Sequence, residues 1–197
     1  MKHLLHTWCR LVMLVALCGF GSMQAAAQST DEPIITLYTN AYQNDGANNH
    51  IQLCLGSNVE SDYIDVDAGF GREEHELVPA QLDPNTQEWT GTVMTLTASS
   101  EGSVRIYGDP AHINLIAAHG CALRRIECSQ LTGLSILDLS HNELEALDLT
   151  PFQQLAAVYV NDNTFHVQPL KVGTPKDNLL ILEMQSVKGL DPSFNLS

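Results

Sequence analysis

A regular repeat of leucines and an asparagine constrains the fold of this chain more than any other feature of its sequence. One unit has four leucines and an asparagine, at Leu134, Leu137, Leu139, Asn142 and Leu144. Adding 21 to each number gives Leu155, Val158, Val160, Asn163 and Phe165. Subtracting 21 gives Ile113, Ile116, Ala118, Cys121 and Leu123. A weaker fourth copy contains Leu179, Leu182 and Met184, with Val187 in place of the asparagine. Such repeats are typical of solenoids, in which units stack because none buries its apolar face alone.

The spacing within a unit predicts a short strand followed by a turn. In Leu137-Asp138-Leu139 the two leucines point into the solenoid and the residue between them points outward. The amide of the following asparagine can satisfy backbone groups that the bend leaves unpaired. We therefore expect Leu139 and Val160, one period apart, to share a single dry interior.

The first half of the chain has a different periodicity. Apolar residues alternate with polar ones in four segments that we expect to be strands, at 34–39, 51–55, 63–66 and 89–97. Clusters of Gly, Asn, Asp and Pro separate them and predict turns. These features indicate a small antiparallel sheet or sandwich. About 65 residues is marginal for an independent core, so we expect this region to pack against the repeats.

The N-terminal segment 1–27 reads as a secretory signal peptide. Lys2 and Arg10 precede an apolar core at 11–20, and the small residues Ala25–Ala27 offer a cleavage site. Lipid attachment at Cys18 is the alternative, which we disfavour because Leu17 is not small. No apolar run approaches the roughly 18 residues of a membrane-spanning helix, so we expect no transmembrane span.

The charge of the chain excludes several classes of partner. There are 9 Lys and Arg against 23 Asp and Glu, a net charge of −14. Loss of the segment 1–27 removes Lys2 and Arg10 but no acid, which leaves 7 basic and 23 acidic residues and a charge of −16. Such a chain lacks the basic patch that nucleic acids or anionic membranes require.

Three cysteines follow the signal peptide: Cys54, Cys121 and Cys128. Their spacing fits no zinc site, and an odd number cannot close into a disulfide framework. At most one bridge is possible, and we favour buried free thiols.

Three segments carry a resemblance to a known family: Val104-Arg-Ile-Tyr-Gly-Asp109, Leu137-Asp-Leu-Ser-His-Asn-Glu-Leu144 and Leu147-Asp-Leu149. They resemble bacterial leucine-rich-repeat proteins, in particular the secreted internalin-like proteins of Bacteroidetes. The resemblance covers 103 to about 190. It implies an exported, non-catalytic, surface-associated protein that binds other proteins or host structures. The chain has few repeats and lacks the C-terminal sorting domain of many relatives, so cell-surface, extracellular and periplasmic locations all stay open.

We therefore predict a mainly β protein in three parts. A signal peptide (1–27) precedes a small antiparallel β-sheet or sandwich domain (28–102). A short leucine-rich-repeat solenoid of about 3–4 repeats of ~21 residues follows (103–197).

The strand ladder of such a solenoid would offer a concave face about 15 Å wide, from four strands spaced ~4.8 Å apart. One outward column is Ala117, Asp138, Tyr159 and Glu183, and a second is His119, Ser140, Asn161 and Gln185, with His141 and Asp162 adjacent. A third column is apolar: Leu115, Ile136, Ala157 and Ile181.

We predict that a protein partner, from a host or bacterial surface, contacts Asp138, Tyr159, Asn161, Asp162, His119, Ile136 and Glu183. The alternative is that the flanking domain or the tail covers the apolar column. His119 and His141 fit solvated turn residues better than ligands or bases.

One acidic segment suggests a metal site. Asp65, Asp67, Glu73 and Glu76 occupy positions 1, 3, 9 and 12 of a calcium-binding loop. Position 5 is Gly69 and position 6 is Phe70, neither of which fits that loop. The alternative is a hairpin with exposed acids, in which Gly69 and Gly71 supply positive φ.

Enzymatic motifs are missing from the sequence, which contains no G-x-S-x-G elbow, H-E-x-x-H motif or phosphate-binding glycine loop. We therefore expect a non-enzymatic protein with no cofactor other than possible calcium. An alternative function is a carbohydrate-binding module that stacks glycans on Trp89, Tyr63 or Phe70, and another is a structural relative without a ligand. The ending at 189–197 supplies no clear polar cap, so we expect rapid amide exchange in the last repeat.

Overall fold

The computed structural model describes all residues except 1–31, 44–48, 86–87, 169, 174–176 and 189–197. The expected signal peptide and the ending at 189–197 lie outside this part. The described residues form a mainly β structure with one short 3-10 helix, η1 (Ala41–Gln43), and no α-helix. No helix in the described ranges is long and apolar enough to cross a membrane. The strands are β1 (Ile35–Thr39), β2 (His50–Ser57), β3 (Asp62–Asp67), β4 (Arg72–Leu77), β5 (Gln81–Leu82), β6 (Trp89–Thr90), β7 (Thr92–Thr97), β8 (Ser103–Tyr107), β9 (Ile113–Ala117), β10 (Leu123–Glu127), β11 (Ile136–Asp138), β12 (Ala157–Tyr159) and β13 (Ile181–Glu183).

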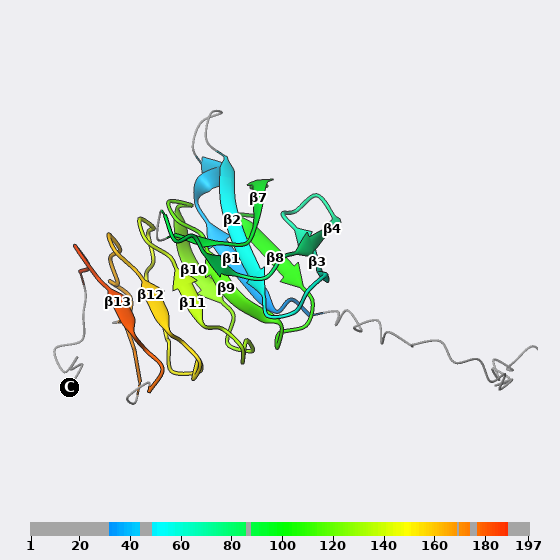
Figure 1. Cartoon of the computed structure of the whole chain (residues 1–197). Helices are drawn as coiled ribbons and strands as arrows, with labels where there is room; N and C mark the ends of the chain where they lie inside the picture. The colour runs from blue at the N-terminus through cyan, green and yellow to red at the C-terminus, as the bar shows by residue number, and fades with distance from the viewer. Residues whose placement is uncertain (1–31, 44–48, 86–87, 169, 174–176, 189–197) are drawn as a thin grey trace, which may run out of the picture.

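Two large sheets contain most of these strands, and β5 and β6 form a separate two-stranded sheet. The five-stranded sheet has the order β10-β1-β8-β3-β4, and all its pairs are antiparallel. The six-stranded sheet has the order β13-β12-β11-β9-β2-β7, and it changes character at β9. That strand pairs parallel with β11 on one edge and antiparallel with β2 on the other. In Figure 1 the parallel strands β11, β12 and β13 lie side by side toward the C-terminal end of the molecule.

The strands expected in the first half are present, with two differences. The segment 89–97 is divided into β6 and β7 at Gly91, where a Cβ would lie 2.4 Å from the carbonyl oxygen of Leu55. Sequence periodicity missed β4, which consists mostly of charged residues. It also missed β5, which has only two residues, Gln81 and Leu82. Charged side chains suit β4 because it is an edge strand, where they discourage pairing with other chains.

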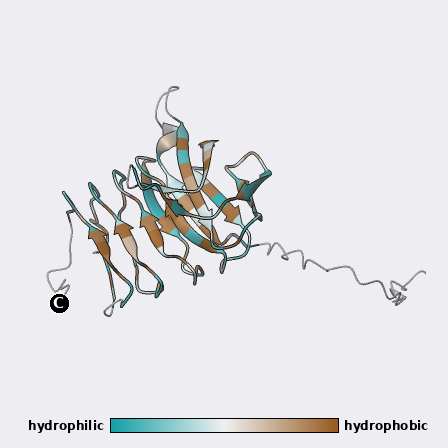
Figure 2. Ribbon diagram, in the orientation of Figure 1, coloured by the Kyte–Doolittle hydropathy of each residue, from teal (hydrophilic) through white to brown (hydrophobic). Residues whose placement is uncertain are grey.

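The repeat period determines the register of the parallel strands. Leu137 pairs with Ile116 on one side and with Val158 on the other, each one full period away in the sequence. Val158 pairs in turn with Leu182, so three extra residues separate β12 from β13. Leu139 and Val160 are both fully buried in one hydrophobic core, as the repeat predicts. In Figure 2 the hydrophobic colour follows β11, β12 and β13, and hydrophilic colour marks the turns beside them.

The buried side chains of the repeat asparagines stabilise the turns by hydrogen bonds to the backbone. Asn142 Oδ1 accepts hydrogen bonds from the backbone N–H groups of Cys121 (2.9 Å) and Leu123 (3.0 Å). Its Nδ2 donates to the carbonyl oxygens of Ala118 (2.7 Å) and Leu139 (3.0 Å). Asn163 makes the equivalent bonds in the next repeat, where its Nδ2 donates to Leu139 O (2.8 Å). The predicted role of the asparagines is therefore confirmed.

A left-handed residue precedes the asparagine position in each coil. These residues are Gly120 (φ 62°), His141 (φ 56°), Asp162 (φ 53°) and Ser186 (φ 55°). Glycine adopts this conformation freely, and aspartate and histidine are enriched there. The turn chemistry of the repeats thus explains why a histidine and an aspartate stand at these positions.

The two halves of the chain share one core and both sheets. A single cluster of buried hydrophobic side chains extends from Ile34 to Leu170. The expected boundary between residues 102 and 103 therefore separates strands that pair with one another, such as β1 with β8 and β2 with β9. At the other end of the ladder, Leu182 and Met184 are only partly buried, since no described strand lies beyond β13.

Candidate binding surface

The first outward column of the six-stranded sheet forms a continuous row. In-register pairing places Asp138 beside Ala117, Tyr159 beside Asp138, and Glu183 beside Tyr159. Glu183 is exposed, and the other three are partly exposed. We call Asp138, Tyr159 and Glu183 the outward triad. The outward orientation expected from the repeat pattern is confirmed for all of them.

The outward triad is distinctive because the rest of its sheet is uncharged. Among the residues of the six strands, Asp138 and Glu183 are the only Asp, Glu, Lys or Arg, and Tyr159 is the only Tyr, Phe or Trp. The described Lys and Arg residues all lie outside these strands: Arg72, Arg105, Arg124, Arg125, Lys171 and Lys188. This sheet therefore presents negative charge on both sides of one aromatic ring.

Neighbouring groups orient both carboxylates of the triad. Asp138 Oδ1 accepts a hydrogen bond from the backbone N–H of Ser140 at 3.0 Å. Glu183 Oε2 accepts one from Asn161 Nδ2 at 3.2 Å, and Asn161 Oδ1 accepts from the N–H of Gln185 at 2.7 Å. The described residues donate no hydrogen bond to Asp138 Oδ2 or Glu183 Oε1, so each acid has one oxygen available to a ligand.

The turns beside the triad carry the predicted histidine and aspartate side chains. The rings of His119 and His141 lie 4.6 Å apart between centroids, and His141 Nδ1 lies 3.2 Å from Asp162 Oδ2. All three residues are exposed, whereas Ser140 in the same column as His119 is buried. Within the described ranges, no group of three or more histidine, cysteine or acidic residues is arranged to hold a metal ion. The predicted residues His119, Asn161 and Asp162 thus flank the triad along one edge.

Three of the four residues in the apolar column are buried, and the fourth, Ile181, is 39% exposed. Ile136 is 4% exposed, and it forms a buried cluster with Leu115 and Ala157. Ala80 and Trp89, from the β5–β6 hairpin and its entry, pack against this cluster. The prediction that Ile136 contacts a partner is therefore wrong, because the hairpin covers it.

The close approach of this hairpin depends on a glycine in β2. A Cβ at Gly56 would lie 2.7 Å from the Cβ of Ala80. Trp89, a large aromatic residue, packs against the cluster, but the periodicity of the sequence does not show which apolar residues it contacts.

The four acids of the expected calcium loop lie on a hairpin. Asp65 pairs with Glu74, and Val66 pairs with Glu73. Because side chains alternate between the two faces of a strand, Glu73 points to the face opposite Asp65 and Asp67. The β3–β4 hairpin thus does not gather Asp65, Asp67, Glu73 and Glu76 around one point.

The turn of this hairpin uses its aspartate and glycines for backbone geometry. Asp67 Oδ1 accepts hydrogen bonds from the N–H groups of Gly69 (2.8 Å) and Gly71 (3.2 Å). Gly69 and Gly71 have φ values of 95° and 106°. This is the arrangement that the alternative interpretation of the segment expected.

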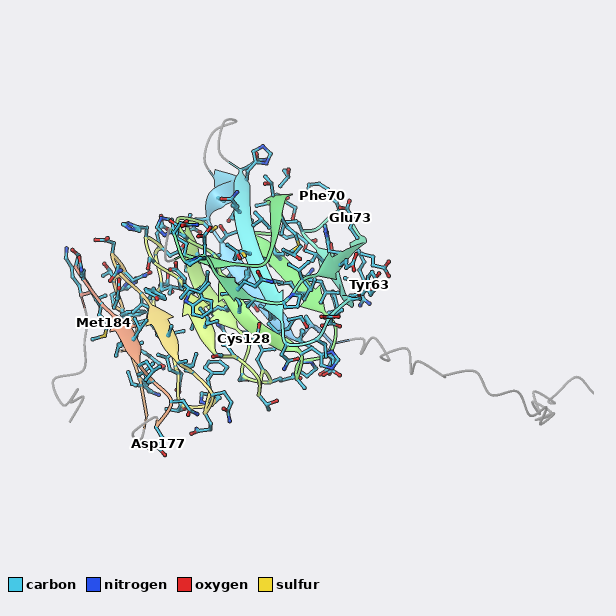
Figure 3. The ribbon with its side chains drawn as sticks, in the orientation of Figure 1. Tyr63, Phe70, Glu73, Cys128, Asp177 and Met184 are labelled. Carbon is cyan, nitrogen blue, oxygen red and sulfur yellow. The ribbon has the colours of Figure 1, made fainter. Side chains whose placement is uncertain are left out.

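The three aromatic residues considered for glycan stacking do not form one platform. Tyr63 and Phe70 are 53% and 74% exposed, but Tyr63 lies near the open end of the β3–β4 hairpin and Phe70 in its turn (Figure 3). Trp89 instead packs against the apolar cluster, as Tyr159 also does. The exposed aromatic rings of the hairpin are therefore two separate positions, Tyr63 and Phe70.

The three thiols are free, as expected. Burial raises the pKa of Cys54 and Cys121, and it raises the pKa of Cys128 to about 12. Cys121 occupies an asparagine position, and its Sγ lies within hydrogen-bonding distance of Gln52 O (3.2 Å) and His119 O (3.4 Å). Protonated thiols are poor nucleophiles, so these cysteines act here as packing groups.

A groove of about 760 Å³ was not predicted from the sequence. None of its lining residues belongs to a strand of the six-stranded sheet. Arg124, Arg125 and Lys171 contribute its positive charge. Arg125 pairs with Glu127, and Lys171 Nζ lies 3.7 Å from Asp148 Oδ2. The pKa of Asp148 is lowered by its hydrogen bonds to Thr150 and by the charge of Lys171. Two of the three cations of the groove are thus already paired with acids.

Comparison of the sequence with protein-family models and with curated proteins, and of the structure with solved structures, found no match.

Proposed function

We propose that this chain is an exported leucine-rich-repeat protein, similar to the internalin-like proteins of Bacteroidetes, that binds a protein partner without catalysing a reaction. Its location would be extracellular, on the cell surface or in the periplasm. The observation that carries the proposal is the outward triad. One acid lies on each side of a tyrosine, on a sheet whose strands contain no other Asp, Glu, Lys or Arg.

The spacing of the repeats supports this proposal. In-register strands one repeat period apart, each followed by a buried asparagine that bonds the backbone, are what a leucine-rich-repeat solenoid requires. In such a solenoid the strand ladder is the usual recognition surface. With four parallel strands the ladder is only about 15 Å wide, which suits a loop or an extended segment of a partner.

The cover over Leu115, Ile136 and Ala157 reduces the apolar part of the expected interface. Because Ile136 is buried under Trp89 and Ala80, the contact surface consists of the triad and its turn residues His119, Asn161 and Asp162. Tyrosine is enriched at the energetic centres of interfaces. We therefore place Tyr159 at the centre of the contact and the acids around it.

A capture experiment with a matched control tests the proposal. The purified protein and its Tyr159→Ala/Asp138→Ala variant serve as baits for bacterial and host surface extracts. Tyr63→Ala/Asp65→Ala removes the same two residue types from β3, which belongs to the other large sheet. We expect the first variant to lose the captured protein and the control to retain it. Equal recovery by all three baits would contradict the proposed surface.

The exposed rings of Tyr63 and Phe70, at the two ends of the β3–β4 hairpin, support a second candidate function, glycan binding by this hairpin. Since the first region shares both sheets with the repeats, the whole chain rather than the segment 28–102 is the material for a glycan array. Binding that disappears in Tyr63→Ala/Phe70→Ala, and persists in Tyr159→Ala/Asp138→Ala, would favour this candidate over the first.

A further inference from the structure

Two tyrosines of this protein carry an arginine over the ring. The guanidinium carbon of Arg72 lies 3.6 Å from the ring centroid of Tyr107, and that of Arg125 lies 5.3 Å from the ring centroid of Tyr38. A guanidinium is attracted to the negative face of an aromatic ring and stacks flat on it. The chain thus uses tyrosine as a platform for arginine in two places.

Each of these pairs is accompanied by an acid. Glu127 accepts a hydrogen bond from the Tyr38 hydroxyl at 2.9 Å and also pairs with Arg125. On the neighbouring strands, Asp65 is in register with Tyr107, and Asp67 with Arg72. The recurring group consists of a tyrosine, an arginine above it and a carboxylate beside it.

The outward triad has two of these three components. Asp138 and Glu183 lie in register on either side of Tyr159, each one strand spacing of ~4.8 Å away. Each acid has an oxygen that accepts no hydrogen bond from the described residues. No Lys or Arg lies on any strand of this sheet. The missing component is therefore the cation.

We infer that the partner supplies an arginine, whose guanidinium stacks on Tyr159 between Asp138 and Glu183. The inference rests on the proposed function and specifies the chemistry of its partner: an exposed, arginine-bearing segment of a protein. Arginine fits better than lysine because its planar fork can stack on the ring while donating to a carboxylate at the side. The negative charge on both sides of the ring complements such a segment and disfavours an acidic one.

Short peptides of defined charge test this inference directly. The probe is acetyl-Gly-Gly-Arg-Gly-Gly-amide, titrated into ¹⁵N-labelled protein and followed by amide chemical shifts. Peptides with lysine, glutamate or citrulline in place of arginine serve as comparisons, because citrulline keeps the shape of arginine without its charge. We expect shifts centred on Asp138, Tyr159 and Glu183, with binding by the citrulline peptide at least tenfold weaker. Equal binding of the arginine and citrulline peptides, or shifts centred elsewhere, would overturn the inference.

Variants separate the triad from the general negative charge of the protein. Asp138→Asn/Glu183→Gln should weaken arginine-peptide binding at least tenfold. Glu74→Gln/Glu76→Gln removes the same charge from exposed positions of β4 and should change it less than twofold. Tyr159→Leu should weaken binding, whereas Tyr159→Phe keeps the ring and should preserve it. Equal weakening by the two charge-removing pairs, or full binding by Tyr159→Leu, would show that no such site exists.

The same variants distinguish this inference from the proposed function. If Tyr159→Ala/Asp138→Ala loses the protein captured from surface extract but Asp138→Asn/Glu183→Gln retains it, the face binds a partner without an arginine in this place. If neither pair affects capture while the arginine peptide still binds the triad, the arginine site stands and the proposed capture surface is wrong.

Discussion

Replacing Asn142 with alanine tests the central structural element of the repeats. This buried side chain accepts hydrogen bonds from the N–H groups of Cys121 and Leu123 and donates to carbonyl oxygens of its own and the preceding coil. Alanine would leave the two N–H groups without this acceptor in the interior. Because Leu139 O also accepts from Asn163 Nδ2, the loss on the carbonyl side is smaller.

The expected loss of stability follows from these bonds. A buried donor left unsatisfied costs about 1–3 kcal/mol, so two of them cost about 2–6 kcal/mol. A domain is stable by only about 5–15 kcal/mol in total. For a chain of this size, a loss of about 4 kcal/mol lowers Tm by about 8–16 °C.

Urea unfolding followed by tryptophan fluorescence measures this loss, since Trp89 packs on a buried cluster that unfolding would disrupt. The control is Asn178→Ala, which removes an exposed amide that donates at 3.3 Å to Gln153 O. We expect the control to change the free energy of unfolding by less than about 0.5 kcal/mol. A similarly small change for Asn142→Ala, with an unchanged m-value, would refute the role that we assign to the asparagine.

Two further predictions concern a buried thiol and the last coil. Burial raises the pKa of Cys128 to about 12 from an ordinary value of 9.0, so the folded protein keeps this proton at a pH where the unfolded chain loses it. The contribution of the thiol to stability is complete below about pH 9 and falls as pH rises from there toward 12. Cys128→Ala should therefore flatten the dependence of the urea midpoint on pH. Equal slopes of midpoint against pH for the variant and the unaltered protein would contradict this. Amides of Leu182 and Met184 should exchange faster than those of Leu137 and Leu139, because their coil is only partly buried; equal protection measured by hydrogen exchange would show that the end of the ladder is covered.

The repeat region was the most predictable part of the fold because its pattern is local. Each repeat has inward leucines and a turn residue at fixed spacing, so Leu139, Val160 and the asparagines could be placed from the sequence alone. The weak fourth copy was also placed correctly, since Leu182 pairs with Val158 despite three extra residues. The charged strand β4 was missed because its residues lack alternation, and its position depends on pairing with β3 rather than on its own composition.

The candidate site was only partly predictable. Outward positions such as Asp138 and Tyr159 follow from the alternation of side chains along a strand. The burial of Ile136 could not be predicted, because an outward residue has the same sequence pattern whether it is covered or exposed. The outcome depends on Ala80 and Trp89, which reach the cluster from a hairpin formed by a distant part of the chain.

Three extra residues lie between β12 and β13, and they leave the pairing of the outward residues unchanged. Although the spacing from β12 to β13 is longer than the repeat period, Tyr159 still pairs in register with Glu183. The extra length is therefore taken up between the strands, and the acid stays beside the ring. The burial of Leu115, Ile136 and Ala157 leaves Ile181 as the one exposed residue of the apolar column on the same face. A partner of this face would therefore be selected by charge and by the aromatic ring more than by apolar area. Its association rate should consequently fall as ionic strength rises, because exposed charges act over about 8–10 Å at physiological salt.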